Sequence, residues 1–358
     1  MTAPWLIDAV DLGVNPKGIS RVLASLADAL CDVAPEDVVF AVTPAGQPAL
    51  AHLPRTRVVC VAPSLQSRWE QVGLPRLARQ LGAAAIYSHR EAGALWGPPL
   101  VLHVPEDPEV RWERTPPTTA KSRARQVYSR SILKAALRRA AVVGVSTSAV
   151  GDQISSRYRL PRTAIRLIPL GVDLERFQPA AVPRADCVFH LGSHDPRDRS
   201  VLVVEGYAGA LRTTALPPLV IGGSLGTSMS AEVEQRALQL GVAVKLTERL
   251  TDEDLADLFR HAAVVVQPSS DEGFGLQPLE AMAAGAKLVV TQAAAVEEVV
   301  ATAAVTVEAT VDGLSKGILE AVSRDELREQ GRTRATTFSW NATARHTLEA
   351  LHDAAGRA

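Results

Sequence analysis

Two glutamates flank a glycine-rich turn in the second half of the chain. Glu272 stands directly before the turn 273–275, and Glu280 follows eight residues after Glu272. A carboxylate can accept two hydrogen bonds from neighbouring hydroxyl groups. The pair therefore predicts contacts with polyols, Glu272 with the hydroxyls of a hexose and Glu280 with the 2′,3′-hydroxyls of a ribose. The alternative is that Asp271 and Glu272 only cap a helix and that Glu280 lies on a solvated face.

The turn lies between predicted elements of secondary structure. Residues 262–266 form an apolar run typical of a buried parallel strand, residues 276–284 predict a short helix, and residues 288–290 predict another strand. A turn that leads into a helix leaves unpaired backbone N–H groups at the positive end of that helix. These amides predict a binding site for an anionic diphosphate. The residues that contribute them are Gly273, Phe274, Gly275 and Leu276.

A second glycine-containing turn follows the predicted strand 187–191. It carries Ser193, Arg197 and Arg199. A guanidinium at the end of a strand can hold a pyrophosphate through two charge-assisted hydrogen bonds. These three residues are therefore further candidates for binding the diphosphate. The alternative is that the two arginines form ion pairs at the surface.

A glycine in the first half of the chain is also a candidate. Gly18 lies between the predicted strand 5–10 and the predicted helix 22–30. Because glycine has no Cβ, the backbone at this turn can approach a diphosphate or a sugar closely. The alternative is an ordinary connection between a strand and a helix.

Apolar runs alternate with helical patterns along the whole chain, which predicts an α/β fold with doubly wound parallel sheets. The other expected strands are 38–42, 57–61, 84–87, 100–104, 142–145, 164–168, 218–221, 243–246 and 305–307. A chain of 358 residues with 47% hydrophobic content can bury two cores. We expect an N-terminal domain over 1–180, a donor-binding domain over 181–337, and a C-terminal helix over 338–358 that packs back on the first domain.

The turns that follow the predicted strands 262–266 and 187–191 carry motifs that resemble those of the retaining glycosyltransferases of family 4. The longest similar segment runs from Pro268 to Gly285. Shorter segments that resemble the family follow the expected order, at 17–21, 168–177, 188–193 and 338–340. The resemblance implies the GT-B fold, in which two Rossmann-like domains face a cleft.

The resemblance also implies an activity. Members of this family transfer a sugar from a nucleotide-diphosphate sugar to an acceptor hydroxyl with retention of configuration, and they need neither a metal nor another cofactor. A histidine after a strand of the first domain approaches the transferred sugar. His103 takes that place if the alignment slips by two residues, whereas Pro105 stands there in the simplest alignment. The alternative for His103 is a half-buried histidine whose ring nitrogens bond to the backbone.

Three positions depart from the family pattern. Asp198 stands where the family usually has a phosphate-binding lysine, Pro105 stands at the histidine position, and Lys287 stands where a proline is frequent. These departures keep open a catalytically weakened nucleotide-sugar-binding protein. A GT-B phosphorylase or a sugar-nucleotide epimerase can also share this architecture.

Composition narrows the class of protein further. A net charge of −1 argues against a nucleic-acid binder. The three cysteines lack metal-ligand spacing and favour a reduced, cytoplasmic compartment. Asp252–Asp254 resembles a metal-binding D-x-D motif, but it follows Thr251 and is typical of a helix N-cap. The absence of a long apolar run predicts a soluble or peripheral protein.

Residues 111–139 contain nine basic residues and a single acidic one, Glu113. Their helical part presents an apolar face and several cationic faces. Such a helix can contact an anionic membrane at its inner face or a lipid-linked acceptor. The alternative is a solvated helix that docks by its apolar face.

Overall fold

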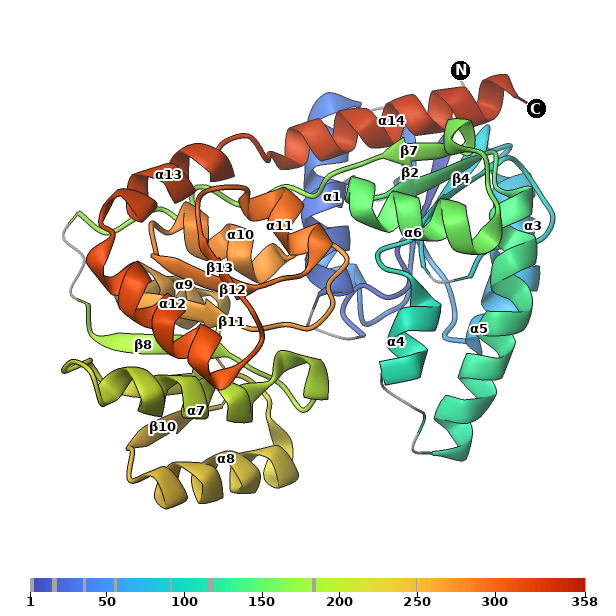
Figure 1. Cartoon of the computed structure of the whole chain (residues 1–358). Coiled ribbons are helices and arrows are strands. Elements are labelled where there is room, and N and C mark those ends of the chain that lie inside the picture. The colour runs from blue at the N-terminus through green and yellow to red at the C-terminus, as the bar shows by residue number, and fades with distance from the viewer. Residues whose placement is uncertain are drawn as a thin grey trace. The chain divides into compact units, whose positions relative to one another are not determined.

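The computed structural model describes residues 3–14, 18–34, 37–54, 57–90, 92–114, 117, 119–181, 185–248 and 250–357. It divides into two compact units. Unit 1 comprises Met1–Gly171 and Trp340–Ala358, and unit 2 comprises Val172–Ser339. The division thus precedes the expected boundary at residue 180, and the last helix clusters with unit 1 (Figure 1).

Unit 1 contains a seven-stranded parallel sheet in the order β3-β2-β1-β4-β5-β6-β7. Its strands are β1 (Trp5–Asp8), β2 (Val38–Val42), β3 (Val58–Cys60), β4 (Ala85–His89), β5 (Leu100–His103), β6 (Val142–Val145) and β7 (Ile165–Leu167). Its helices are α1 (Ile19–Val33), η1 (Gln47–Leu50), α2 (Gln66–Arg68), the π-helical turn η3 (Trp69–Gly73), α3 (Leu74–Gln80), α4 (Pro108–Arg114), α5 (Ala120–Arg139), α6 (Ser148–Tyr158), η4 (Arg162–Ala164) and α14 (Trp340–Gly356).

Unit 2 contains a six-stranded parallel sheet in the order β10-β9-β8-β11-β12-β13. Its strands are β8 (Cys187–Leu191), β9 (Leu219–Gly222), β10 (Val244–Thr247), β11 (Ala262–Gln267), β12 (Leu288–Thr291) and β13 (Val305–Val307). Its helices are η5 (Pro196–Asp198), α7 (Ser200–Leu211), α8 (Gly226–Leu240), α9 (Asp252–His261), α10 (Leu276–Ala283), α11 (Ala294–Val300), α12 (Val311–Ser323) and α13 (Glu326–Ala335).

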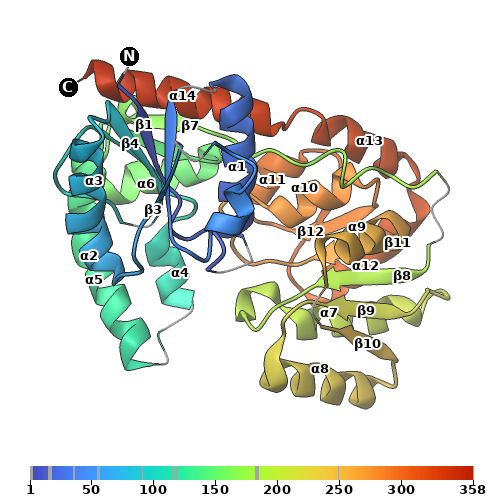
Figure 2. The ribbon, with the colours of Figure 1, turned by 180° about the vertical axis from the view of Figure 1, so that it is seen from behind.

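Helices cover both faces of the unit 2 sheet, as Figures 1 and 2 show. Helix α7 packs with α8 and α12, whereas α10 packs with α9, α11 and α13. Every residue of the central strand β11 is buried. A strand covered on both faces needs apolar side chains on both, which explains why β11 reads as a continuous apolar run.

Each sheet has a point where its strand order reverses. In unit 1 the chain first adds β2 and β3 on one side of β1 and then places β4 on the other side. In unit 2 it adds β9 and β10 beside β8 and then places β11 on the opposite side. The loops that leave β1 and β4 therefore run in opposite directions from the edge of the unit 1 sheet, and those that leave β8 and β11 do so in unit 2. Open α/β sheets bind ligands at such switch points.

The strands expected from the sequence are confirmed within a few residues at each end. The interpretation of Asp252–Asp254 as a helix N-cap is also confirmed, because the Thr251 side chain accepts from the amide of Asp254 and the Asp254 side chain accepts from the amide of Thr251. The apolar face of α5 is confirmed only in its second half, where Leu133, Ala136 and Leu137 are buried. Helices α4 and α6 and the turn η3 were not anticipated.

The last helix completes the core of unit 1. Helix α14 packs against α1 and contacts β4, β5 and β6. Ala344, Ala350, Leu351 and Ala354 belong to the same buried cluster as the strand residues Ile7 and Phe40, among others. Unit 1 is therefore built from both ends of the chain.

Shortening a fully buried side chain of α14 should destabilise unit 1. We expect Leu351→Ala to lower the free energy of unfolding by about 2–5 kcal/mol, because it removes apolar contacts and leaves a cavity. Urea unfolding followed by circular dichroism measures the change. Leu238→Ala, at an exposed position of α8, is the control and should stay close to the unchanged protein; equal losses in both variants would contradict the packing role of α14.

Candidate functional site

Two turns meet at the switch point of unit 2. One turn, 192–199, follows β8, and the other, 268–275, follows β11. The amide of Ser270 donates a hydrogen bond to the carbonyl of Arg197 at 3.1 Å. The hydroxyl of Thr291, at the end of β12, donates to the carbonyl of Ser269 at 3.0 Å. The structure therefore brings together the two turns that the sequence identified separately.

A buried histidine lies beneath these turns. His190 Nδ1 lies 2.9 Å from the carbonyl oxygen of Val266, and Nε2 lies 3.1 Å from Ser200 Oγ. Because a carbonyl only accepts, Nδ1 carries the proton and Nε2 accepts from the hydroxyl. Burial lowers the pKa of His190, which the carbonyl of Val266 partly offsets. His190 is thus a neutral link between β8, β11 and the start of α7.

Gln267 extends this link to the helix that follows the signature turn. Its side-chain amide lies beside His190 Nδ1 and donates to the side-chain oxygen of Gln277 in α10. Neither His190 nor Gln267 was among the candidate residues predicted from the sequence. The available signal was a polar residue near the carboxyl end of an otherwise apolar strand, which is costly to bury without a partner.

The start of α10 has the features of an anion site. Gly275 precedes the helix in the left-handed region, with φ of 93°, and no side chain caps the helix. Glycine reaches this conformation without steric cost. The amides of the first turn, at Leu276 and Gln277, are consequently available to an anion, and the helix dipole favours negative charge there.

The two glutamates have different surroundings. Glu272 and Gly273 are half-buried in the turn before α10. Glu280 is only 4% exposed within α10, which contradicts the solvated-face alternative. Phe274 is also buried, and its ring packs edge-to-face on Phe338 with centroids 5.7 Å apart. The side chain of Phe274 therefore contributes packing, and its backbone amide is the group available for a ligand.

The turn after β8 contains an internal ion pair. Asp195 accepts from the amide of Arg197 at 2.9 Å and from its Nε at 3.0 Å. Burial raises the pKa of Asp195, but the bonds from Arg197 outweigh this and hold it below the usual value. Ser193 Oγ accepts from the amide of Asp195 at 3.1 Å. Arg197 thus follows the ion-pair alternative, and much of its charge is neutralised.

Arg199 has an unusual backbone. It precedes α7 with φ of 51° and ψ of 42°, in the left-handed region. A non-glycine residue there carries roughly 1 kcal/mol of strain. Strained backbone positions of this kind cluster at functional sites, which makes the turn before α7 a candidate for ligand binding.

Gly18 stands at the start of α1 in unit 1, with φ of 54° and ψ of −98°. A Cβ at this position would meet no atom within 4 Å among the residues that the structure describes. The backbone conformation, rather than crowding, therefore explains the glycine. Lys17, part of the family-like motif, lies outside the described residues.

His103 is fully buried at the end of β5. Its Nδ1 lies 2.7 Å from the Tyr87 hydroxyl and its Nε2 lies 2.9 Å from Ser146 Oγ. The ring of His89 lies beside it, with centroids 4.3 Å apart. The partners of His103 are side chains rather than the backbone groups of the alternative, and its approach to the transferred sugar stays a prediction.

The described residues contain no group of three or more histidine, cysteine, aspartate or glutamate side chains placed to hold a metal ion. Across the same residues, no helix combines the length and apolar character needed to span a bilayer.

Two units, each a doubly wound parallel sheet, are the architecture of the GT-B class of glycosyltransferases. Residues 16–176 match the family model described as Glycosyltransferase Family 4, and residues 175–338 match the model described as Glycosyl transferases group 1. The chain belongs to the family-4 glycosyltransferases.

Known proteins are similar over most or part of the chain. D-inositol 3-phosphate glycosyltransferase of Paenarthrobacter aurescens is 26% identical, with 94% of this chain and 93% of that protein covered. The MMP alpha-(1->4)-mannosyltransferase of Mycolicibacterium hassiacum is 30% identical over 59% of this chain and 54% of that protein. The chain thus spans about half of the second relative.

Solved structures share the fold at low identity. Anabaena HepE in complex with UDP-glucose superimposes with a TM-score of 0.73 at 16% identity, covering 98% of this chain and 100% of that chain. WaaG, a glycosyltransferase involved in lipopolysaccharide biosynthesis, gives a TM-score of 0.68 at 15% identity, covering 96% and 98%. These similarities establish the architecture.

The buried histidines make the stability of unit 1 depend on pH. Burial lowers the pKa of His89 from 6.5 to about 4, and burial together with His89 lowers that of His103. Below pH 6.5 the unfolded chain binds protons that the folded chain excludes, so stability is complete above 6.5 and falls as the pH decreases towards 4. His89 alone accounts for roughly 3 kcal/mol of this loss.

Replacing His89 should therefore flatten the acid limb of the stability curve. We expect His89→Asn to lose less stability than the unchanged protein between pH 6.5 and about 4, as measured by urea unfolding at each pH. The exposed His52 supplies the control, His52→Asn, which should keep the original slope. An unaltered slope in His89→Asn would show that other groups cause the acid sensitivity.

Proposed function

We propose that this glycosyltransferase moves a sugar from a nucleotide-diphosphate sugar to an acceptor hydroxyl, with retention of configuration and without a metal. The observation that carries the proposal is the meeting of two turns at the unit 2 switch point, linked by the 3.1 Å bond from Ser270 to Arg197. This places an uncapped helix start beside a strained, arginine-bearing turn. Such a constellation suits a diphosphate.

Each polar group has a role in this proposal. The amides of Gly273 to Leu276 hold the diphosphate, Glu272 binds the donor sugar, and Glu280 binds the ribose hydroxyls. The position of Glu280 in the first turns of α10, four residues after Leu276, supports this role because it places the carboxylate close to the amides at the helix start. Arg199 and Ser193 face the same ligand from the other turn, while Arg197 orders that turn through Asp195.

The chemistry follows from where charge develops. As the anomeric carbon–oxygen bond breaks, the electron pair moves to the leaving diphosphate, and the helix-terminal amides stabilise that charge. The acceptor oxygen then attacks the anomeric carbon on the face that the diphosphate leaves, and the acceptor proton passes to a phosphate oxygen. This route needs no enzyme nucleophile, which fits the burial of His103.

The names of similar proteins suggest the substrates. One relative acts on D-inositol 3-phosphate, another is a mannosyltransferase, and the HepE structure contains UDP-glucose. We therefore include uridine diphosphate sugars and nucleotide-activated mannose as candidate donors for this chain. For Gly18, we propose that its backbone approaches the donor.

A catalytically weakened nucleotide-sugar-binding protein is a second candidate. The Asp195–Arg197 pair favours it, because an arginine neutralised by its neighbour stabilises a developing negative charge less well. Slow donor hydrolysis without acceptor separates the two, since a transferase releases some free sugar and nucleotide diphosphate. Tight binding with no release at all would favour the binding protein.

Removing the charge of Glu280 should weaken nucleotide binding. We expect Glu280→Gln to bind its preferred nucleotide, UDP or GDP, about tenfold less tightly, because charge-assisted bonds to the ribose become neutral ones. Isothermal titration of both nucleotides measures this change, and a thermal melt checks the fold.

Glu232→Gln, at an exposed position of α8, is the matched control and should bind normally. If neither nucleotide binds the unchanged protein, the donor role of unit 2 is wrong. If Glu280→Gln binds as tightly as the control, Glu280 does not contact the ribose.

We further propose that helix α5 contacts an anionic membrane surface from the cytoplasmic side, where it meets a lipid-linked acceptor. Lys121, Arg123 and Arg125 are exposed in its first half. Ser129 is the first buried residue of this helix, so these three cations lie before the part of the helix that packs on unit 1. Each cation near an anionic surface contributes about 1 kcal/mol of attraction.

Reversing two of these charges should abolish membrane binding. We expect Lys121→Glu with Arg123→Glu to reduce binding to phosphatidylglycerol-containing vesicles at least tenfold, measured by co-sedimentation. Arg212→Glu, an exposed charge reversal in unit 2, should bind normally, and phosphatidylcholine vesicles should bind none of the proteins. Equal binding by all variants would remove α5 from the membrane contact.

A further inference from the structure

A chain of side-chain hydrogen bonds links the two turns that are proposed to bind the diphosphate. It begins at Ser200, the first residue of α7, whose hydroxyl donates to His190 Nε2 at 3.1 Å. His190 Nδ1 lies 3.0 Å from Gln267 Oε1, and Gln267 Nε2 donates to Gln277 Oε1 in the first turn of α10. The chain thus joins the starts of the two helices that follow these turns.

One backbone carbonyl sets the direction of every bond in this chain. His190 Nδ1 lies 2.9 Å from the carbonyl oxygen of Val266, which only accepts, so Nδ1 carries the proton. The neighbouring Gln267 must therefore present its oxygen to the histidine and its nitrogen to Gln277. Gln277 in turn presents its oxygen to Gln267, and its nitrogen, with two N–H groups, is left for another acceptor.

The nitrogen of Gln277 has no acceptor among the residues that the structure describes, and the side chain is half-buried. Gln277 is the second residue of α10, whose start no side chain caps. Helical side chains lean towards the start of their helix, and Glu280 lies three residues later on the same side of α10. The free N–H groups therefore lie on the side of the helix that carries both the uncapped start and the carboxylate proposed to bind the ribose.

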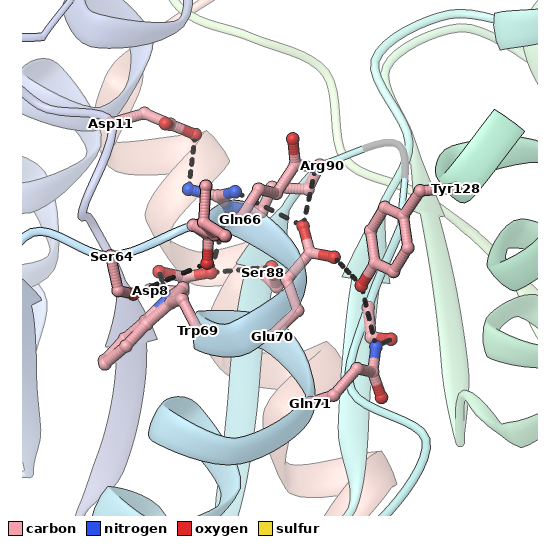
Figure 3. Close-up of polar contacts among 12 residues, drawn as sticks. Asp8, Asp11, Ser64, Gln66, Trp69, Glu70, Gln71, Ser88, Arg90 and Tyr128 are labelled. Carbon is pink, nitrogen blue, oxygen red and sulfur yellow. Dashed lines mark hydrogen bonds and ion pairs between the residues drawn. The ribbon is translucent and has the colours of Figure 1, made fainter. Parts of the chain in front are cut away.

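A glutamine of unit 1 shows what a purely structural amide looks like. Figure 3 shows Gln71 beside Tyr128. Gln71 Nε2 donates to the carbonyl of Gly93 at 3.0 Å and to the Tyr128 hydroxyl at 3.1 Å. Its Oε1 accepts from the amide of Leu95 at 3.1 Å. Both ends of this amide bond within the protein, whereas Gln277 uses its oxygen alone.

Charged groups replace the neutral chain at the switch point of unit 1 (Figure 3). Arg90 follows β4, and its Nε lies 3.1 Å from Asp8 at the end of β1. Its Nη2 lies 2.7 Å from Asp11, and its Nη1 lies 3.3 Å from Glu70. Ion pairs thus join the strands of unit 1, while the chain of unit 2 is uncharged and ends in a half-used amide.

We propose that Gln277 binds the diphosphate of the nucleotide sugar through its side-chain N–H groups, and that His190 and Gln267 are positioning residues that keep these groups turned towards the ligand. This inference rests on the proposed function. A hydrogen bond to a charged phosphate oxygen contributes more than one between neutral groups. An amide that rotated freely would present its oxygen to the anion part of the time, and the bond from Gln267 prevents this rotation.

Removing the amide should weaken the binding of nucleotides that carry a diphosphate. We expect Gln277→Met to bind UDP or GDP, whichever the unchanged protein prefers, about tenfold less tightly in isothermal titration. The corresponding nucleoside, uridine or guanosine, should bind as before in ligand-observed NMR, because it has no phosphate. Methionine is unbranched and favours helices like glutamine, so α10 should stay intact.

A second variant tests the positioning role. Gln267→Met removes the bond to Gln277 but leaves Gln277 in place, and it should weaken diphosphate binding about threefold because the amide can then rotate. Combined with Gln277→Met, it should cause no further loss, since both changes act through the same amide. A separate structural effect of Gln267 on the site would instead add to the loss in the double variant.

Gln235→Met, at an exposed position of α8, is the matched control and should bind nucleotide and nucleoside normally. Thermal melts of all variants show whether unit 2 remains folded. If Gln267→Met unfolds, the comparison of Gln277→Met with the control decides.

Three results would overturn the inference: Gln277→Met binds the diphosphate like the control, it loses nucleoside binding to the same degree, or the losses of the two single variants add. In each of these cases the unchanged protein still binds its nucleotide, so the proposed function stands. If the unchanged protein binds neither UDP nor GDP, the donor role of unit 2 fails and this inference fails with it.

Discussion

Parallel strands that are added first on one side of a starting strand and then on the other leave two diverging turns at the same edge of the sheet. Both units of this chain place their polar groups at that edge. The central strands β5, β6, β11 and β12 are buried and mainly apolar, so their hydrogen-bonding side chains concentrate where the strands end. In unit 2 this edge carries the family-4 signature, and in unit 1 it carries Arg90 and its carboxylates.

At the switch point of each unit, a polar side chain joins two neighbouring strands, but the two units use different side chains for this. In unit 2 a neutral histidine, His190, joins two strands through a carbonyl and a hydroxyl, and the turns above it present mainly backbone amides. In unit 1 a permanently charged arginine joins two strands through carboxylates. Amides suit an anionic leaving group, and in our proposal the bonds from His190 through Gln267 add the side-chain amide of Gln277 to them.

Because Asp195 pairs with Arg197, this arginine is less available to an anion, and in our proposal the backbone amides at the start of α10 bind the anion instead. With that arginine neutralised and Asp198 in place of a lysine, the turn after β8 supplies less positive charge than the family pattern implies. In our proposal, most of the positive potential at this edge then comes from the uncapped start of α10 and from Arg199. In our proposal these helix-terminal amides stabilise the leaving diphosphate, and they need no reorientation during the reaction because the helix already orients them.

The sequence alone determined the order of the strands, because their apolar runs depend on neighbouring residues, whereas helices α4 and α6 were not anticipated. It also determined the signature turn and the capping role of Thr251, which are local. The tertiary structure decided what depends on distant partners. From the sequence, His103 is either a histidine that approaches the sugar or a half-buried one bonded to the backbone, whereas the structure shows Tyr87 and Ser146 as its partners. Arg90 and Asp11 carry no motif, yet segments far apart in the chain assemble them into one cluster. Burial and charge pairing arise from contacts that no local pattern encodes.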